Sequence, residues 1–300
     1  MSELIDRLPR AAVEVLESIY QHRLLSTGHV HQLHTATSSR RWTQQLLNTL
    51  ADRQLLGAVH GRGAAKLWFL SEAGADAVEA IPTRAEQRRK VVTPAQAAGQ
   101  LQQHTLAVND VGLTYVLAAR ERGDEFGPFS WRHEIAHPIG TAPGRRRGEL
   151  LIADALLTYL QTDGASIQQH QRFLELDRGT IPIDALLGKL HRYQRLRRYT
   201  PERPRAGHEP APAWRATYPS LPAVQIVLAH KPRRALEHRL QLLLALYASD
   251  PALHHDRHLH VVVALLEDLQ RHGPFAPIWL RADDPSRRID WLDLPRRSPR

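Results

Sequence analysis

The sequence has no cysteine, and that absence excludes two classes of site at once. The 300-residue chain can form neither disulfide bonds nor zinc sites with thiolate ligands. Apolar runs are short as well, and none approaches the roughly 18 residues that a membrane-spanning helix needs. The first residues lack a basic segment followed by an apolar one, so we expect no signal peptide. The sequence therefore predicts a cytoplasmic protein that does not contact a membrane.

Three signatures of common enzyme classes are also missing. The chain has no GxxxxGK[ST] phosphate loop, no GxSxG turn and no GxGxxG segment. It is therefore not a P-loop ATPase, and it lacks the serine-hydrolase turn and the dinucleotide-binding fingerprint.

Lysine is scarce in a chain that is otherwise strongly basic. The sequence has 40 Lys and Arg residues and a net charge of +9, yet only four of the 40 are lysines. A basic protein of this size usually meets a polyanion, and double-stranded DNA is the expected partner. The alternative is that the basicity reflects only genome composition. The scarcity of lysine makes Lys189, which lies near several acidic residues, more notable.

The first eighty residues have the order of elements of a winged-helix domain, which we place at residues 9–81. Apolar periodicity and turn residues predict three helices and then two strands, at 10–22, 27–34, 40–50, 55–60 and 66–70. Residues 36–39 (ATSS) form an N-cap cluster ahead of the third helix.

The third helix and the hairpin carry the predicted DNA contacts. In such a domain the third helix enters the major groove and the hairpin touches the backbone. Ser and Arg near a helix N-terminus suit phosphate contact. The predicted contacts are Ser38, Ser39, Arg40, Arg41 and Arg62. The apolar residues of the helix are predicted to be core, namely Trp42, Leu46, Leu47 and Leu50. The alternative is a domain that binds protein or dimerises.

The rest of the chain predicts an α/β (α+β) domain with a central mixed sheet. Residues 82–98 are polar and aperiodic and are interpreted as a linker, and residues 286–300 as a basic tail. Between them, residues 99–285 have the order α-β-β-β-α-β-α-β. The helix at 233–247 is apolar enough to form a homodimer interface, but core packing explains it equally well.

Acidic residues on two of these strands predict a metal site. Glu175 and Asp177 lie two apart on a short strand, so they share a face. Asp154 lies in the preceding apolar run, and Lys189 with Tyr193 lies on the following helix. We expect Asp154 and Glu175 to ligate one Mg²⁺ or Mn²⁺, with a main-chain carbonyl near Leu176. Asp177 is a further ligand or the partner of Arg178, and Lys189 orients water or neutralises phosphate.

The order of elements resembles the restriction-endonuclease-like PD-(D/E)xK fold. That resemblance implies a metal-dependent endonuclease with Asp154, Glu175, Asp177, Lys189 and Tyr193 as its catalytic residues. Two positions depart from the usual motif. Asp177 stands where the motif has its lysine, and some members of the superfamily carry that lysine on the next helix, as Lys189 would be. Ala153 stands where the motif has a proline, which shapes the backbone but binds no metal.

Across most of residues 10–280 the chain also resembles the replication-relaxation family of plasmids and other mobile elements. The resemblance rests on the winged helix, on Lys189 with Tyr193, and on five short segments. They are His104–Asp110 (HTLAVND), Trp131–Glu134 (WRHE), Ile152–Asp154 (IAD), Phe173–Thr180 (FLELDRGT) and Gly273–Trp279 (GPFAPIW). It implies a role in plasmid replication or transfer, with replication or transfer proteins as partners.

Three alternatives remain open from the sequence. The first is a non-catalytic DNA-binding initiator or adaptor in which the charged residues form only salt bridges. The second is a winged-helix transcription regulator with an inert C-terminal domain. The third is a histidine metal site at His258 and His260 on a strand, with Tyr193 or Tyr199 as the nucleophile.

Overall fold

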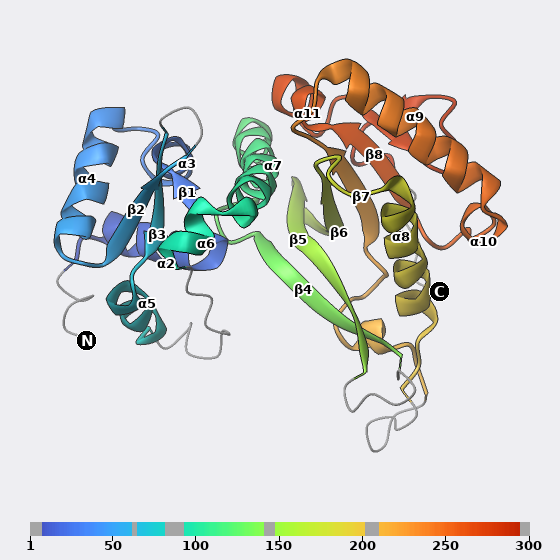
Figure 1. The fold of residues 1–300 in the computed structure, drawn as a ribbon, viewed down its shortest axis with the longest axis horizontal. Coiled ribbons are helices and arrows are strands. Elements are labelled where there is room, and N and C mark those ends of the chain that lie inside the picture. Colours follow the sequence, from blue (N-terminus) through green and yellow to red (C-terminus); the bar gives the residue numbers. More distant parts are fainter. Residues whose placement is uncertain (1–7, 62–64, 82–92, 141–147, 202–209, 295–300) are drawn as a thin grey trace. The chain divides into compact units, whose positions relative to one another are not determined.

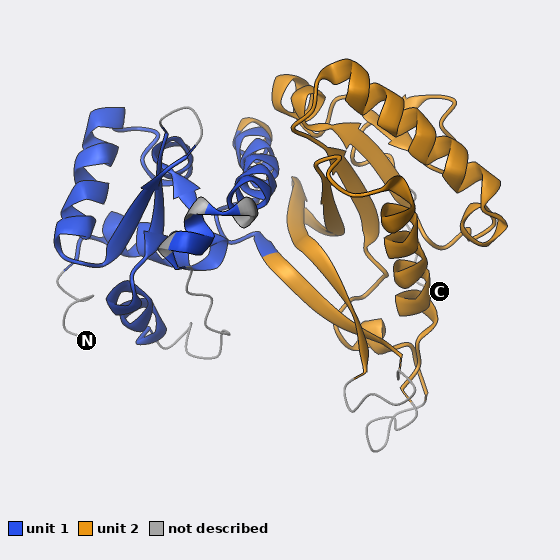
Figure 2. Cartoon of the chain, in the orientation of Figure 1, with its two compact units in different colours: residues 1–120, 126–132 blue, residues 121–125, 133–300 orange. Residues whose placement is uncertain are grey.

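A computed structural model of the chain describes residues 8–61, 65–81, 93–140, 148–201 and 210–294. The chain divides into two compact units, shown in Figure 2. Unit 1 comprises residues 1–120 and 126–132, and unit 2 comprises residues 121–125 and 133–300. No helix among the described residues is long and apolar enough to cross a membrane.

Unit 1 contains a winged helix, as the sequence predicts (Figure 1). Its three antiparallel strands have the order β1-β3-β2. The elements, in chain order, are α2 (Arg10–His22), β1 (Leu25–Ser26), α3 (Thr27–His34), α4 (Arg40–Asp52), β2 (Leu56–His60), β3 (Lys66–Leu70) and α5 (Glu72–Glu79). The two-residue strand β1, which pairs with β3, is too short for periodicity to predict.

Serine side chains begin three of these helices. Ser26 accepts the backbone N–H of His29, and Ser71 accepts that of Gly74, each at 3.0 Å. Ser39 accepts the N–H of Trp42 at 3.1 Å at the start of α4. Each serine satisfies a backbone donor that has no partner within its helix, and this fixes where the helix starts.

The long helix α7 (Gln100–Arg122) belongs largely to unit 1, not to the C-terminal domain that the sequence predicted to begin at residue 99. Asn109 is the reason, since its side chain donates to the carbonyl of Leu24 at 2.9 Å and accepts from the indole of Trp131 at 3.3 Å. One helical position later, Asp110 accepts from His29 of α3 at 2.8 Å. The HTLAVND segment therefore ties α7 to the winged helix.

The predicted linker is also not uniform. Residues 82–92 lie outside the described residues, but α6 (Pro94–Ala98) is a short helix in the second half of that segment. The side chain of Thr93 caps this helix by accepting the N–H of Gln96, and the side chain of Gln96 accepts the N–H of Thr93. This capping box is the sequence feature that indicates a helix start, although the polar composition of the segment had indicated a linker.

Unit 2 is built on a seven-stranded mixed sheet with the order β10-β9-β8-β7-β6-β5-β4. The β5–β6 pair is antiparallel, β6–β7 and β7–β8 are parallel, and β8–β9 and β9–β10 are antiparallel. The strands are β4 (Trp131–Gly140), β5 (Glu149–Asp163), β6 (Ser166–Asp177), β7 (Ala223–Leu228), β8 (Val261–Leu265), β9 (Trp279–Arg281) and β10 (Arg288–Ile289).

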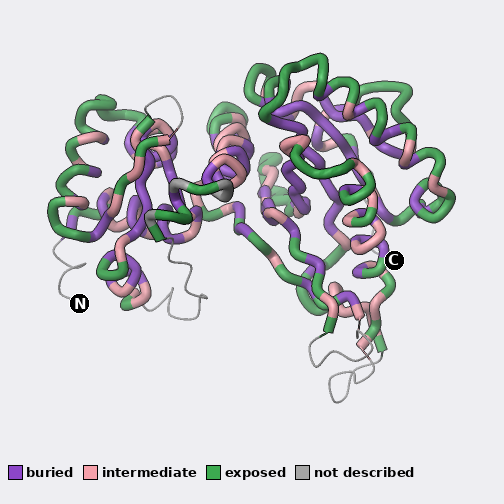
Figure 3. The backbone as a smooth tube through the Cα atoms, viewed as in Figure 1, coloured by how far each residue is buried: buried purple, intermediate pink, exposed green. Residues whose placement is uncertain are grey.

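Two helices cover one face of this sheet, α8 (Ile183–Arg198) and α9 (Arg233–Ser249). Val224, Ile226 and Leu228 of β7 pack into one apolar core with residues of both helices. All six residues of β7 are buried, as expected for a central strand covered on both faces. Figure 3 shows buried residues along the central strands of this sheet. Core packing thus accounts for five apolar residues of α9, Leu236, Leu240, Leu243, Leu244 and Tyr247, whereas Leu242 of the same helix is 39% exposed.

The end of the chain departs from the predicted basic tail. Ile289 of β10 pairs with Trp279, and Trp291 is fully buried, where its indole donates to Gln225 of β7 at 2.8 Å. The described residues up to 294 therefore complete the sheet and its core. Periodicity also misses three short elements, namely the 3-10 helix η2 (Ala213–Ala216), α10 (Pro251–His254) and α11 (Leu266–His272).

Candidate nucleic-acid interface and carboxylate site

The first turn of α4 is a polar, basic and exposed surface. Ser38, Ser39, Arg40 and Arg41 are all exposed, and neither arginine forms an ion pair within the described part of the chain. The hydroxyl of Ser39 is already used as the helix cap. The backbone N–H groups of this turn add a partial positive charge to that of the two guanidinium groups. The predicted contact Arg62 lies outside the described residues.

Trp42 does not lie in the core, contrary to the sequence prediction. Its side chain is 41% exposed, whereas Leu47 and Leu50 of the same helix are buried as predicted and Leu46 is half-buried. Residues 43, 47 and 50 recur at helical spacing and form the buried stripe of α4, so position 42 falls beside that stripe. The tryptophan therefore extends the exposed surface that begins at Arg40.

Two neighbouring strands and the helix that follows them assemble the predicted carboxylate site in unit 2. Glu175 and Asp177 lie on the face of β6 that points to the core beneath α8 and α9. Asp154 lies on β5, one residue before the ladder pair of Ala155 with Leu174. Its carboxylate accepts the N–H of Leu176 at 2.8 Å. The main chain near Leu176 thus donates to Asp154, where the sequence predicted a carbonyl for a metal.

Lys189 of α8 joins the two acids. Its ammonium lies 3.1 Å from a carboxylate oxygen of Asp154 and also contacts Glu175 directly. One helical turn later, the hydroxyl of Tyr193 donates to the other oxygen of Glu175. The side chain of Glu175 is only 2% exposed, whereas those of Asp154 and Lys189 are about one-fifth exposed. These four residues form what we call the carboxylate site, and solvent reaches it at Asp154 and Lys189.

The site holds two carboxylates against one ammonium, and the pKa values reflect that imbalance. Burial, together with the charge of Asp154, raises the pKa of Glu175 to about 8, and Lys189 opposes that rise. Burial disfavours the charge on Lys189, but Glu175 and Asp154 outweigh it and raise its pKa. Burial and the charge of Glu175 raise the pKa of Tyr193 well above its ordinary value. Tyr193 is therefore a protonated donor and a poor nucleophile.

Asp177 lies outside this cluster despite sharing the strand face. Its carboxylate is held by the guanidinium of Arg239 on α9, with Nη2 at 3.2 Å, and it accepts the N–H of Gly179 at 2.9 Å. Neither predicted role, further metal ligand or partner of Arg178, describes this geometry. The structure instead gives Asp177 a structural contact, which ties the end of β6 to α9.

The carboxylate site offers two protein ligands of the kind that Mg²⁺ and Mn²⁺ prefer. Among the described residues there is no group of three or more His, Cys, Asp or Glu that could hold a metal ion. Asp154 and Glu175 are nevertheless both within reach of one cation, because the ammonium of Lys189 contacts both. Magnesium is commonly held by one or two carboxylates plus water and substrate phosphate. The donor set fits such an ion if Lys189 withdraws.

The histidine alternative is wrong in its geometry. Strand β8 begins at Val261, so His258 and His260 precede the strand and do not alternate on it. His258 instead lines a pocket with Asp256, Arg257 and the two arginines that end α8, and the sequence did not reveal this pocket. The only sequence feature that points to this pocket is the cluster of histidines at residues 254–260.

Comparison with known proteins gives one match over most of the chain. The replication-relaxation family matches residues 16–211. Solved structures with similarity include BpsR of Bordetella bronchiseptica, described as having its DNA binding regulated by 6-hydroxynicotinic acid. It is 23% identical, with a TM-score of 0.24 over 38% of this chain and 76% of that one. ZitR of Lactococcus lactis (C30AH42A mutant) is 14% identical, with a TM-score of 0.23 over 38% and 74%.

No curated protein matches the chain significantly. The winged-helix assignment rests on the helices and strands of unit 1 themselves, because both TM-scores are low.

Proposed function

The chain belongs to the replication-relaxation family, and from that premise we propose that it binds double-stranded DNA in plasmid or mobile-element replication or transfer. The observation that carries the proposal is the exposed first turn of α4, where Arg40 and Arg41 have no acidic partner among the described residues. The third helix of a winged helix is the element that enters the major groove.

The chemistry of that turn suits DNA in two ways. Guanidinium groups bind phosphate bidentately, and the N-terminal N–H groups of a helix favour an anion. The exposed indole of Trp42 adds an apolar surface that is able to contact a thymine methyl group or a sugar. Phosphate contacts supply affinity, and base contacts from the same helix supply specificity.

A matched pair of charge substitutions on one helix tests this proposal. Arg41→Gln removes a charge from the first turn of α4, and Arg53→Gln removes one from its exposed C-terminal end. Fluorescence anisotropy with a labelled duplex measures both variants. We expect Arg41→Gln to weaken binding about tenfold and Arg53→Gln to have little effect. Equal affinities for the two variants would remove α4 as the contact.

A second function, metal-dependent hydrolysis of a phosphodiester bond, is favoured by the convergence of Asp154, Glu175, Lys189 and Tyr193. Residues from two strands and one helix meet at one point that is partly open to solvent. This is the donor set of a nuclease-like site, with hard oxygen ligands and an adjacent cation. The PD-(D/E)xK assignment of unit 2 belongs to this proposal.

In that function Asp154 and Glu175 would hold the ion, which would supply Lewis-acid chemistry toward a phosphoryl oxygen and water. The protein's own residues have separate tasks. Tyr193 keeps one oxygen of Glu175 in place through its hydrogen bond. Lys189 leaves the carboxylates and neutralises the charge of the bound phosphate instead.

Cleavage of labelled plasmid, single-stranded and branched DNA with Mn²⁺ tests hydrolysis directly. Wild type is compared with Asp154→Ala and Glu175→Ala, and DNA binding is measured in parallel. We expect cutting by the wild type alone and equal binding by all three proteins. Equal binding without cutting by the wild type would favour a non-catalytic adaptor or regulator, in which the carboxylate site is only structural.

A further inference from the structure

A second polar cluster lies at the C-terminal end of α8, where a pocket of about 340 Å³ opens beside α10. We call it the arginine pocket. Its polar lining residues are Arg197, Arg198, His255, Asp256, Arg257 and His258. The pocket is distinct from the carboxylate site, since none of these residues contributes to that site. Its volume falls at the lower end of the range of roughly 300–1,000 Å³ that is usual for small-molecule sites.

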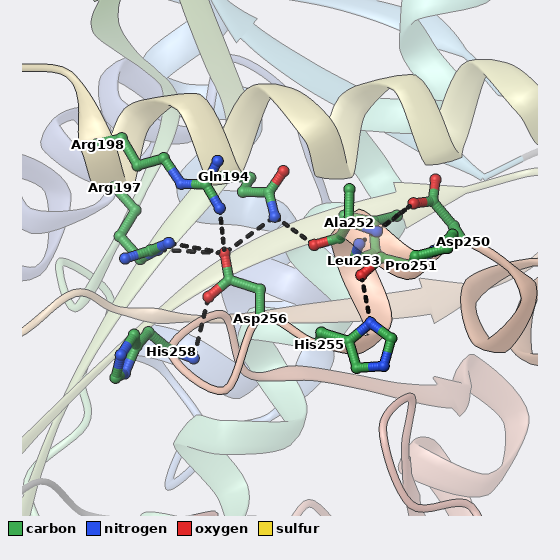
Figure 4. Close-up of polar contacts among 10 residues, drawn as sticks. All are labelled: Gln194, Arg197, Arg198, Asp250, Pro251, Ala252, Leu253, His255, Asp256 and His258. Atoms are coloured by element: carbon green, nitrogen blue, oxygen red, sulfur yellow. Dashed lines mark hydrogen bonds and ion pairs between the residues drawn. The ribbon is translucent and has the colours of Figure 1, made fainter.

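Asp256 organises the arginine pocket, as Figure 4 shows. Its side chain is only 1% exposed. One carboxylate oxygen accepts from Gln194 at 3.0 Å and from Nε and Nη2 of Arg197 at 3.2 and 3.0 Å. The guanidinium of Arg198 lies 3.8 Å from the same oxygen, and the other oxygen accepts the N–H of His258 at 3.1 Å. A buried acid therefore holds the guanidinium of Arg197 in place, with that of Arg198 nearby.

The charge of the arginine pocket is not balanced. Three guanidinium groups line it against one carboxylate, which leaves two positive charges in excess. Arg198 is 63% exposed, and Arg257 forms no ion pair among the described residues. Arg197 uses Nε and Nη2 for Asp256, so its Nη1 edge is not engaged by that acid. The pocket thus presents guanidinium donors whose positive charge its single carboxylate, Asp256, only partly balances.

From this geometry we propose that the arginine pocket binds a phosphate group. Guanidinium is the side chain best suited to phosphate, because its planar fork donates two parallel hydrogen bonds. Asp256 positions the fork of Arg197 before the ligand arrives, which lowers the entropy lost on binding. Phosphate of this kind is present both on a free nucleotide and along a nucleic-acid strand, and both would offer the same oxygen atoms.

The test uses the full chain and calorimetric titration with three probes, which are inorganic phosphate, deoxyadenosine monophosphate and a short single-stranded oligonucleotide. Arg257→Gln is compared with Arg234→Gln, which removes the same charge from an exposed position on α9. We expect wild type and Arg234→Gln to bind at least one probe equally and Arg257→Gln to bind it about tenfold more weakly. Arg198→Gln, also exposed, provides a second variant should Arg257→Gln fail to fold.

The three probes separate the two sources of phosphate. Binding of the mononucleotide or of inorganic phosphate identifies a free ligand, and binding of the oligonucleotide alone identifies a nucleic-acid backbone. Either pattern supports the proposal when Arg257→Gln weakens the binding of that probe. The proposal is overturned if the wild type binds none of the probes, or if Arg257→Gln and Arg234→Gln bind alike. Loss of duplex binding in Arg41→Gln leaves these outcomes unchanged, so the two proposals fail separately.

Discussion

The first turn of α4 and the carboxylate site place charge in opposite circumstances. On α4, Arg40 and Arg41 are exposed and have no acidic partner among the described residues. In the carboxylate site, Lys189 contacts both Asp154 and Glu175, and Tyr193 holds Glu175 from the other side. A polyanion that meets α4 displaces only water. A metal ion that enters the carboxylate site must first displace an ammonium.

The two functions therefore differ in the free energy that is lost when their charged groups change partners. Exposed charges lose little on binding, and their affinity comes from ions released from the DNA. Buried charges are already satisfied, and removing one partner leaves the other without solvation. Unit 1 therefore needs no rearrangement to bind, whereas hydrolysis in unit 2 requires Lys189 to move.

Removal of Lys189 has the largest expected effect on stability. Lys189→Ala leaves Glu175 buried without a cation, and we expect the free energy of unfolding of unit 2 to fall by about 3–5 kcal/mol. The loss should be greater at about pH 9 than at about pH 5, because in acid Glu175 is protonated and neutral. Urea unfolding at both pH values measures it, with Lys231→Ala as an exposed control. A Lys189→Ala protein as stable as wild type would show that the ammonium does not balance the acids.

Removal of Arg239 tests whether Asp177 is structural. Arg239→Gln leaves the buried carboxylate of Asp177 with the N–H of Gly179, and we expect stability to fall by about 2–3 kcal/mol. Arg234→Gln makes the same charge change at an exposed position of the same helix, α9, and should change stability by less than about 0.5 kcal/mol. Thermal unfolding compares the two. Metal-dependent cutting, where present, should persist in Arg239→Gln, and its loss without unfolding would return Asp177 to the catalytic residues.

Unit 1 has a half-buried histidine whose pKa is lowered, whereas the pKa of Glu175 is raised. Burial lowers the pKa of His34 to about 4, and its Nε2 is buried without a hydrogen-bond partner among the described residues. A depressed histidine pKa favours the neutral folded form, so stability is lost as pH falls from about 6.5 toward 4. We expect a loss of about 1–2 kcal/mol at about pH 5. Melting curves of His34→Gln should lack this acid dependence, and an unchanged dependence would exclude His34 as its source.

Trp42 should matter for DNA and not for folding. Because its side chain is 41% exposed, Trp42→Ala should change stability by less than about 0.5 kcal/mol. We expect duplex affinity to fall about fivefold, since the indole is a large apolar surface beside Arg41. Anisotropy and thermal unfolding measure the two quantities on the same protein. A stability loss with unchanged affinity would place Trp42 in the core, as periodicity had predicted.

The sequence could predict the carboxylate site because its parts are close in chain order. Asp154 and Glu175 lie on consecutive strands of one antiparallel pair, and α8 follows directly with Lys189 and Tyr193 one turn apart. The pairing of strands and the helical repeat suffice to bring the four residues together. The three helices and the hairpin of unit 1 were predictable because apolar periodicity marks each element and serine caps begin α3 and α4.

Contacts between segments that are distant in the chain leave no local pattern in the sequence, so they could not be predicted. Arg239 and Asp177 are 62 residues apart, and so are Gln194 and Asp256, so no local pattern pairs them. The assignment of α7 to unit 1 depends on Asn109 reaching the carbonyl of Leu24, 85 residues away. The arginine pocket likewise forms only when the end of α8 meets the segment around residue 256.

The most direct test of the comparison is duplex affinity as a function of salt for wild type, Arg41→Gln and Asp154→Ala. Affinity measured from about 50 to about 200 mM salt gives the number of phosphate contacts. We predict that Arg41→Gln lowers the salt slope by about 1 and weakens binding, while Asp154→Ala leaves slope and affinity unchanged. A loss of affinity in Asp154→Ala with none in Arg41→Gln would contradict the account and place the DNA on unit 2.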